Sequence, residues 1–372
     1  MRIADLPSPR AVVDLDRMES NCRAMAARAQ WLGVRLRPHV KTHKTVEGAM
    51  VQHGGALGPV TVSTLAEARL LADAGFSDVT YAVPIEPSKF AAAADVARRL
   101  EHLALLVDHD DAAAALGRFA AGAGVRLGVF VKVDCGGRRS GVDPNGVEGA
   151  RLAARLSGAA NLDFRGVLTH AGQAYACRTR EEARAVAAVE RDVTVGFARA
   201  LESRGVRVGE VSVGSTPTMC AVDDLAGVTE IRPGNYAFFD AFQAAIGSCT
   251  LADCAFTVLT RVVGSSPARR EAVIDAGALA LSKDPGPVHV DPAFGFGVVL
   301  DVEGNHVPGW RVASLSQEHG VLRVPEGATL PGIGAPLRIV PNHSCLAAAL
   351  HPSYAVARGG DVVGEWRPAR GW

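Results

Sequence analysis

Lys41 is the residue of this chain whose position most suggests chemistry. It lies in the segment Arg37–Lys44 (RPHVKTHK), directly after the short apolar-alternating stretch 34–36. A lysine at the end of a buried strand is readily driven to its neutral amine, because a low-dielectric pocket disfavours the ammonium. A neutral amine is the nucleophile that a carbonyl cofactor needs. The alternative is a solvated lysine at the exposed end of a surface strand.

His343 and Cys345 form a second candidate site near the end of the chain. They are two residues apart in the segment Pro341–Cys345 (PNHSC). On an extended segment, residues i and i+2 point to the same side. An imidazole and a thiolate together suit Zn²⁺ and are poor ligands for Mg²⁺ or Ca²⁺. Taken alone, the pair is also what a buried cysteine beside a turn histidine would look like.

The elements that must position Lys41 alternate along the first two thirds of the chain. Apolar strand-like runs are followed by stretches rich in Ala, Arg and Leu with helical period. The expected strands are 34–38, 60–63, 79–83, 103–107, 125–133, 164–169, 210–213 and 228–232, and the expected helices include 64–74, 88–100, 110–121 and 180–203. Asp14, Thr64 and Asp110 are the expected N-caps. Eight strands, each followed by a helix or turn, predict an α/β chain with a (β/α)8 barrel, and a doubly wound open sheet is the alternative.

The sequence changes in character after about Phe242. Long helical periods stop, and short runs of Val, Thr and Leu separated by Gly and Pro predict an all-β domain. Its expected strands are 255–263, 271–275, 298–302, 310–314, 336–340 and 361–364. We expect the boundary between Phe242 and Ala252, which gives a barrel over residues 1–245 and a C-terminal β domain over residues 246–372. Roughly the first ten residues could instead join the β domain.

Composition excludes several classes of protein. The chain has 372 residues, enough for two domains, and its 39 basic and 39 acidic residues leave no net charge with which to attract nucleic acid or an anionic membrane. No apolar run has the length of a membrane span, and the N-terminus does not have the pattern of a signal peptide. Seven cysteines without close pairs indicate reduced thiols and a cytoplasmic protein.

Unusual residue clusters follow most of the expected barrel strands. Lys41 follows the first strand, Arg139 lies in the segment 134–141 after the fifth, and His170 ends the sixth. Segments 214–218 and 232–236 follow the seventh and eighth strands. In a barrel these strand ends share the face that carries active sites. Ser and Thr beside Gly offer backbone N–H groups and hydroxyls to a phosphate, although each cluster alone is also typical of an ordinary turn.

This arrangement resembles the alanine-racemase-type (fold type III) pyridoxal phosphate enzymes, which are built on such a lysine, arginine and phosphate cup. The whole chain is similar to one branch of them, the D-serine dehydratase and D-threonine aldolase group. The segments that carry the resemblance are Arg37–Lys44, Arg232–Tyr236, Gln317–Gly320 and Pro341–Cys345. The resemblance implies that Lys41 is the Schiff-base lysine of pyridoxal 5'-phosphate. The other cofactor-binding residues that it implies are Arg139, His170, Tyr175, Gly214, Ser215, Thr216, Gly234 and Asn235. The choice of Arg139 over Arg138 rests on its spacing from Asp134 and Gly141.

In the same group, a pair such as His343 and Cys345 binds a divalent metal beside the cofactor. Zinc is the expected ion, with manganese or magnesium as alternatives. Two protein ligands leave positions open for water and a substrate hydroxyl, which describes a Lewis acid rather than a structural zinc.

The resemblance also implies the reaction. A His-x-Cys pair favours a carbon–oxygen lyase that eliminates the β-hydroxyl of D-serine or 3-hydroxy-D-aspartate. The alternative is a carbon–carbon lyase, a retro-aldolase of the D-threonine type that gives glycine and an aldehyde. Lys41 is then the base that takes the α-proton. His319 is a candidate acid or base, and a plain turn histidine is the alternative for it.

Two alternative functions have less support from the sequence than a lyase. A non-catalytic carrier of pyridoxal phosphate would resemble the barrel alone, so the β domain with its metal pair argues against it. An amino-acid racemase needs a second base, usually a tyrosine, and the surroundings of Tyr354 do not match the racemase motif. We therefore expect a homodimeric cytoplasmic lyase that takes a small D-amino acid as substrate, with no nucleic-acid or membrane partner.

Overall fold

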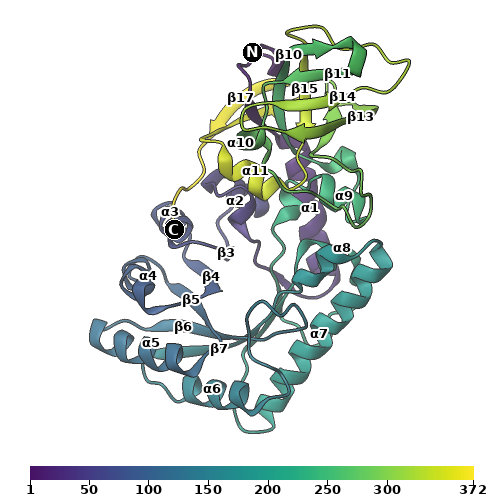
Figure 1. The fold of residues 1–372 in the computed structure, drawn as a ribbon. Helices are drawn as coiled ribbons and strands as arrows, with labels where there is room; N and C mark the ends of the chain where they lie inside the picture. Colours follow the sequence, from purple (N-terminus) through teal and green to yellow (C-terminus); the bar gives the residue numbers. More distant parts are fainter. The chain divides into compact units, whose positions relative to one another are not determined.

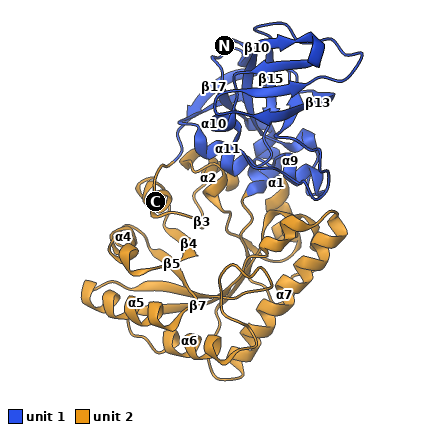
Figure 2. Cartoon of the chain, in the orientation of Figure 1, with its two compact units in different colours: residues 1–23, 235–368 blue, residues 24–234, 369–372 orange.

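The computed structural model describes residues 1–372, and the chain folds into two compact units. Figure 1 shows the order of the elements and Figure 2 the division. The barrel unit comprises residues 24–234 and 369–372, and the β unit comprises residues 1–23 and 235–368. This division differs from the expected boundary at 245/246. The segment 235–245 makes its backbone hydrogen bonds within the β unit, for example from Ala241 N to Pro341 O (3.1 Å).

Eight parallel strands form the barrel unit in the order β2-β9-β8-β7-β6-β5-β4-β3. Their bounds are β2 Arg35–Leu36, β3 Val60–Val62, β4 Asp78–Pro84, β5 His102–Val107, β6 Leu127–Lys132, β7 Leu162–Leu168, β8 Glu210–Val213 and β9 Glu230–Ile231. The two outer strands meet through a parallel bridge between His39 and Thr61, and Thr61 N donates to Pro38 O (2.9 Å). The sheet therefore closes on itself, which confirms the predicted barrel and excludes the open sheet.

Helices cover this barrel as the periodicity predicts. The barrel unit contains α2 Val46–Gln52, α3 Leu65–Asp73, α4 Phe90–Ala97, α5 Asp110–Ala123, α6 Val147–Ser157, α7 Arg180–Glu202 and α8 Thr216–Ala221, and α1 Leu15–Trp31 leads into it from the β unit. Thr64 caps α3 as expected, because its side chain accepts from Glu67 N. The expectation that Asp110 is the N-cap of α5 is wrong. The imidazole of His109 accepts from Asp111 N instead, so Asp110 becomes the first helical residue.

The β unit contains a nine-stranded sheet in the order β11-β14-β13-β12-β15-β10-β1-β16-β17. Its strands are β1 Arg10–Asp14, β10 Phe256–Ser266, β11 Glu271–Ile274, β12 Val298–Leu300, β13 His306–Leu315, β14 Gly320–Arg323, β15 Pro336–Val340, β16 Tyr354–Arg358 and β17 Asp361–Trp366. All neighbours are antiparallel except β1 and β16. The predicted all-β character is confirmed. The N-terminal strand joins this sheet, and the short helices α9 Ala241–Ala245, α10 Ala278–Leu281 and α11 Ser344–Leu350 were not predicted.

The interior of the barrel has a distinct apolar middle. Ala104, Leu106, Phe130 and Leu168 are buried against one another on adjacent strands. Because alternate strand residues face the same side, Phe130 and Lys132 of β6 point into the same interior. Charged residues lie beyond this apolar layer at both ends of the strands. None of the helices is long and apolar enough to cross a membrane.

Candidate active site

The segment that carries Lys41 is fixed on both sides by buried polar contacts. Arg37 lies before it, 1% exposed, and its guanidinium binds Asp78 and Glu230. His43 lies after it, fully buried, with Nε2 3.0 Å from Gln52 Oε1. Burial lowers the pKa of His43 to about 4, so this imidazole is neutral. The histidine and arginine of the motif therefore hold the short helix η2 Val40–Thr42, which presents Lys41.

His39 fixes the backbone of Lys41 directly. Its Nδ1 accepts a hydrogen bond from Lys41 N (3.3 Å), and its Nε2 lies 3.4 Å from Ser63 Oγ. Burial, and then the nearby cations Lys41 and Arg232, hold the pKa of His39 well below its usual range. A neutral ring that accepts at Nδ1 carries its proton at Nε2. His39 therefore positions the lysine while adding no charge.

Lys41 opens into a cavity of about 170 Å³ at the carboxyl ends of the barrel strands. Its lining contains four cationic side chains and two histidines, and no aspartate or glutamate. These residues are Lys41, Lys132, Arg139, Arg232, His39 and His170. Apolar side chains and two serines complete the wall. A cavity with this lining is suited to a ligand that carries several negative charges.

His170, an expected site residue, lies in this cavity. Its Nδ1 is 3.2 Å from Gly214 O, and a carbonyl can only accept, so Nδ1 carries the proton. Burial, and then Lys41 and Arg232, hold the pKa of His170 well below its usual range. The ring is therefore neutral, with Nε2 deprotonated.

Glu190 holds the loops after β7 and β8 together and was not predicted. This fully buried residue of α7 accepts hydrogen bonds from Ala171 N (2.8 Å) and Gly214 N (3.1 Å). Burial raises the pKa of its carboxyl group. The bonds fix both His170 and the start of the segment 214–218. No local sequence signal distinguishes Glu190 from the other acidic residues of this long helix.

Arg232 is the second residue that the sequence analysis did not assign to the cofactor site. It is 4% exposed, lines the cavity, and donates from Nε to Ser212 Oγ (2.8 Å) and from its terminal nitrogen to Thr169 O. Burial lowers the pKa of Arg232 to about 10, so the group remains a cation at neutral pH. Its position at the end of the eighth expected strand was a usable signal, because that end shares the face of Lys41.

The expected phosphate-binding residues divide into two groups in the structure. Gly214 N donates to Glu190, and Ser215 N donates to Thr218 Oγ1 (3.0 Å) in the cap of α8. The backbone N–H groups of Gly234 and Asn235 have no acceptor within the protein. Gly234 lies against His39, since a Cβ there would be 2.7 Å from His39 O. Only glycine therefore fits at this position.

The loop after β6 presents Arg139 rather than Arg138. Asp134 Oδ1 accepts from Gly136 N (2.9 Å) and Arg138 N (3.1 Å), which folds the loop back on itself. Arg139 then lines the cavity and Arg138 does not. Tyr175 lies half-buried in the short helix η4 Gly172–Ala176, five residues after His170, and is outside the cavity lining.

The metal pair lies in the β unit, and its backbone differs from the expectation. The predicted extended segment is wrong, because His343 is the extended N-cap of helix α11 and Cys345 belongs to its first turn. The Ala- and Leu-rich stretch that follows explains why a helix starts here. Both side chains are half-buried, and a side-chain hydrogen bond joins His343 to Cys345, so the pair still lies together.

Hydrogen bonds of Asn342 and Ser344 and a contact between Asp284 and His343 hold this pair in place. Asn342 Nδ2 donates to Asp284 O (2.9 Å) and Gly295 O (2.8 Å). Asp284 Oδ2 lies 3.5 Å from His343 Nδ1, which leaves Nε2 of that imidazole for a metal. Asp240 Oδ2 accepts from Ser344 N (2.9 Å). No group of three or more His, Cys, Asp or Glu side chains in the chain could hold a metal, so His343 and Cys345 would be its only two ligands from this set.

His319 lies apart from these contacts within the β unit. It is exposed at the turn between β13 and β14, where Ser316 N donates to His319 O (2.8 Å). Gly277 packs on this turn, since a Cβ there would be 2.4 Å from His319 N. A catalytic role for His319 remains a prediction.

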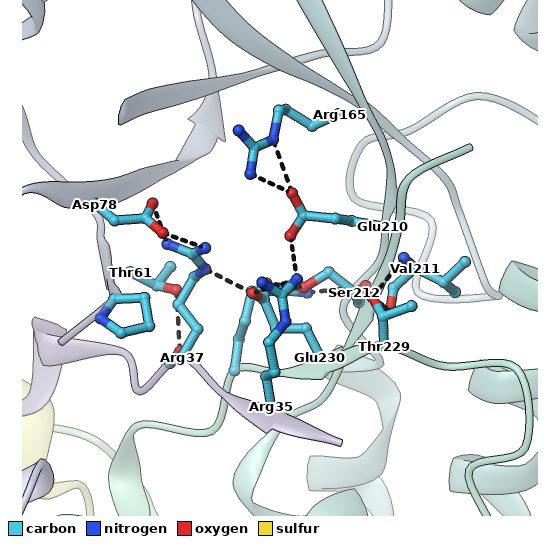
Figure 3. Close-up of polar contacts among 12 residues, drawn as sticks. Arg35, Arg37, Thr61, Asp78, Arg165, Glu210, Val211, Ser212, Thr229 and Glu230 are labelled. Carbon is cyan, nitrogen blue, oxygen red and sulfur yellow. Dashed lines mark hydrogen bonds and ion pairs between the residues drawn. The ribbon is translucent and has the colours of Figure 1, made fainter. Parts of the chain in front are cut away.

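The amino ends of the barrel strands carry a different charged network (Figure 3). Arg37 binds Asp78 at 2.7 and 2.9 Å and Glu230 at 2.7 Å. Glu210 binds Arg35 at 2.6 Å and Arg165 at 2.7 Å. Larger hollows of about 900 and 340 Å³ lie at this end, but their guanidinium groups are mostly paired with carboxylates. Size alone therefore does not mark the ligand site.

Comparison with known proteins defines the class. A family model described as "Alanine racemase, N-terminal domain" matches residues 13–241, and one described as "Putative serine dehydratase domain" matches residues 255–357. The chain therefore belongs to the alanine-racemase-type enzymes, in the D-serine dehydratase and D-threonine aldolase group that the motifs indicated.

Individual relatives cover nearly the whole chain. D-threo-3-hydroxyaspartate dehydratase of Delftia sp. strain HT23 is 39% identical over 99% of this chain and 98% of its own, and its solved structure matches with a TM-score of 0.93 over the full length of both. D-serine dehydratase of Dictyostelium discoideum is 32% identical over 100% and 98% of the two chains. D-threonine aldolase of Filomicrobium marinum is 31% identical, with a TM-score of 0.86 over 98% and 96%.

D-threo-3-hydroxyaspartate dehydratase has also been solved as mutants in which a histidine and a cysteine two residues apart were separately replaced by alanine. The cysteine mutant is in a metal-free form. This spacing equals that of His343 and Cys345.

Proposed function

We propose that this protein is a lyase dependent on pyridoxal 5'-phosphate and a divalent metal, which removes water from 3-hydroxy D-amino acids. The observation that carries the proposal is the cavity around Lys41. It combines a lysine at the end of the first barrel strand with three further cations and no carboxylate. The relatives named as dehydratases of D-serine and D-threo-3-hydroxyaspartate support the choice of reaction.

The residues present fit the cofactor. Its phosphate requires donors, and the N–H groups of Gly234 and Asn235 lack acceptors within the protein. The N–H groups of Gly214 and Ser215 are already bonded, and the Ser215 hydroxyl also contacts Thr218 in the cap of α8. Arg139 is suited to an acidic oxygen of the ring. When bound, pyridoxal phosphate supplies an electron sink for the electrons released at the substrate Cα.

The chain's own groups then account for the proton movements. Lys41, once its amine is freed, takes the α-proton. His170 and His39 are neutral, so neither protonates Lys41 nor competes with it as a cation. Loss of the α-hydrogen and the β-hydroxyl releases one water and gives an enamine. Its imine tautomer is hydrolysed by another water to a 2-oxo acid and ammonia.

The donor set of the second site fits a divalent metal. The imidazole of His343 is oriented by Asp284, and the thiol of Cys345 lies two residues away on the same side. A nitrogen and a sulfur ligand favour zinc, with manganese or magnesium as alternatives. When bound, the metal supplies a Lewis acid for the departing hydroxyl. The proposal therefore requires the pair and the Lys41 cavity to serve one substrate.

A retro-aldolase is the second candidate, because a D-threonine aldolase is among the relatives. Product analysis separates the two functions. Purified holoenzyme is given D-serine, D-threonine and 3-hydroxy-D-aspartate, and the products are identified by mass spectrometry and chiral chromatography. A 2-oxo acid with ammonia supports the dehydratase, and glycine with an aldehyde supports the aldolase. Formation of the L-enantiomer alone would contradict both.

The metal is tested in the same assay. Chelation and the Cys345→Ala substitution should each lower turnover by about 10²-fold or more, because several kcal/mol of Lewis-acid assistance are lost. The visible absorption of the bound cofactor should remain. Cys249→Ala is the matched control, since this cysteine is also half-buried in the β unit. Unchanged elimination by exhaustively chelated enzyme would contradict the metal's role.

We also propose that the working form is a homodimer. Leu279 of α10 and Leu346 and Leu350 of α11 are exposed apolar side chains on two helices in mutual contact, and α11 itself contains Cys345. Such a surface is suited to burial against a second copy. Sedimentation at assay concentrations should show a dimer, and a fully active monomer would contradict this. Buried free thiols at Cys22, Cys135 and Cys254 support a cytoplasmic enzyme.

A further inference from the structure

Asn235 connects the candidate metal pair to a buried polar network of the β unit. The residue is 2% exposed, and its Nδ2 donates a hydrogen bond to Cys345 Sγ (3.7 Å). The same nitrogen donates to Asp240 Oδ2 (2.6 Å) and to Ser344 Oγ (3.1 Å). A carboxamide nitrogen carries two hydrogens, so Asp240 takes one of them, and Ser344 and Cys345 share the other.

Asp240 fixes which way the amide of Asn235 points. It is 1% exposed and also accepts from Gln243 N (2.9 Å), Ser344 N (2.9 Å) and Ser344 Oγ (3.2 Å). If the amide were turned over, its oxygen would lie against a carboxylate oxygen, which places two acceptors together. The nitrogen of Asn235 therefore faces Asp240, and its second hydrogen is directed toward Cys345.

The oxygen of the same amide is left open. Asn235 Oδ1 is buried and accepts no hydrogen bond within the protein. An unpaired buried acceptor is costly, so such atoms normally receive a donor. Water on a divalent ion and a substrate hydroxyl are both donors. The amide of Asn235 is thus complete only when a donor from outside the chain lies beside it.

A donor beside a sulfur ligand affects the metal in a defined way. Cysteine binds metals as the thiolate, and an N–H donor bonds more strongly to a charged acceptor than to a neutral one. Groups that contact a metal ligand orient it and change metal affinity. His343 has such a partner in Asp284 (3.5 Å). Asn235 is the corresponding partner of Cys345.

We propose that Asn235 is the positioning residue of the sulfur ligand: its amide, held by Asp240, donates to Cys345 Sγ and raises the affinity of the pair for a divalent metal. This inference rests on the proposed function, which places the metal at His343 and Cys345. In that proposal, Asn235 contacts the cofactor phosphate through its backbone N–H alone. Substitution of its side chain therefore separates an effect on the metal from an effect on the cofactor.

The first measurement is metal affinity. Holoenzyme stripped of metal is titrated with Zn²⁺ by calorimetry in the presence of a competing chelator. In Asn235→Ala and Asn235→Leu the affinity should fall by about 10- to 100-fold, the usual effect of losing a group that contacts a metal ligand. The visible absorption of the bound cofactor should remain, because both variants keep the backbone N–H. The leucine variant preserves the side-chain volume, and melting curves show that both variants are folded.

The second measurement reports on the sulfur atom itself. Cd²⁺ bound to a cysteine thiolate has a charge-transfer absorption in the ultraviolet, and hydrogen bonds to the sulfur change the energy of its electrons. Loss of the bond from Asn235 leaves these electrons less tightly held, so the band should move to longer wavelength in Asn235→Ala. Cys345→Ala should lose the band, which assigns it to this thiol rather than to another cysteine.

Asn21→Ala is the matched control for a purely structural effect. Asn21 is 7% exposed, and its Nδ2 donates to Asp253 O (2.8 Å) and to Ala237 O (3.4 Å). Ala237 ends the short helix η5 Asn235–Ala237, so this carboxamide holds the same segment through its backbone. Asn21→Ala should lower the melting temperature because buried hydrogen bonds are lost. Its Zn²⁺ affinity and Cd²⁺ band should stay at the wild-type values.

The outcomes separate this inference from the proposed function. Wild-type Zn²⁺ affinity and an unmoved Cd²⁺ band in both Asn235 variants would overturn the role of Asn235, and so would an equal loss of affinity in Asn21→Ala. Metal binding that survives in Cys345→Ala would overturn this role together with the proposed metal pair. If the wild type binds metal through Cys345 but releases no water from any 3-hydroxy D-amino acid, the proposed dehydratase is wrong, and the affinity comparison still decides the role of Asn235.

Discussion

The two ends of the barrel interior carry similar numbers of cations but treat them differently. At the amino ends of the strands, Arg35, Arg37 and Arg165 are paired with Asp78, Glu210 and Glu230 (Figure 3). At the carboxyl ends, Lys41, Lys132, Arg139 and Arg232 line a cavity without a carboxylate. Phe130 and its apolar neighbours separate the two layers.

This contrast distinguishes charged side chains that stabilise the fold from charged side chains that are available to a ligand. Paired charges at one end satisfy each other and need no ligand, even though the hollows there are larger. At the other end the cations face a cavity whose lining contains no carboxylate, so an anionic ligand there would meet no competing acid. The sum of charges over the whole chain is zero, so composition hides the difference completely.

Loss of Lys41 should have the largest effect at the carboxyl ends of the barrel strands. Lys41→Ala should no longer attach the cofactor covalently, and turnover should fall by roughly 10²- to 10⁴-fold or more because the base is also lost. The measurement is borohydride reduction followed by peptide mass spectrometry, together with visible absorption. Lys89→Ala should behave like wild type. Cofactor fixed by borohydride in Lys41→Ala would show that another lysine carries it.

Removal of the central cation at the paired end should mainly affect stability. Arg37→Met removes the guanidinium that contacts buried Glu230 at 2.7 Å and leaves that carboxylate with Ser212 Oγ and the more distant Arg35 (3.7 Å). The free energy of unfolding should therefore fall by about 3–5 kcal/mol. Arg35→Met is the matched control. Arg35 is half exposed in the same network, and its loss should cost at most about 1 kcal/mol. Urea unfolding of both variants checks the order, and equal losses would remove the distinction between the two positions.

Removal of Lys132, at the carboxyl ends of the strands, should change the free energy of unfolding in the opposite direction. Lys132→Met should raise the stability of the cofactor-free protein by about 1–3 kcal/mol at neutral pH, because an unpaired buried ammonium is lost. Urea unfolding again provides the measurement. A decrease comparable to that of Arg37→Met would show that Lys132 has an internal partner after all.

The stability that Lys132→Met gains over wild type should depend on pH in a definite direction. The pKa of Lys132 is lowered from 10.5 to about 8 in the folded protein, so its cost is fully present below pH 8. Between about pH 8 and 10.5 the unfolded chain binds the extra proton, and wild-type stability recovers relative to the variant as pH rises. The difference between wild type and Lys132→Met should therefore shrink across that range. A constant difference would contradict the burial of an unpaired ammonium.

Much of this architecture was predictable because it depends on local patterns. Alternating strand and helix signals gave the eight barrel strands, and the change after Phe242 gave the β unit. The boundary was less predictable, because strand β1 pairs with β10 and β16 from the other end of the chain. Such pairing leaves no local signal. His343 and Cys345 were recognisable from their types and spacing, whereas the helix start at Ser344 could have been read from the alanines after it.

By itself, the sequence determined which chemistry is available and where along the chain it occurs. Lys41, His170 and the Gly-rich segments each follow a strand, and the ends of parallel strands meet on one face of a barrel. Only the tertiary structure decided which charges are paired. Glu190, Glu230, Arg232 and Lys132 look alike in composition, yet three of them have internal partners and Lys132 has none. The reason is that pairing depends on barrel closure and on the inward direction of alternate residues, which bring together side chains far apart in the sequence.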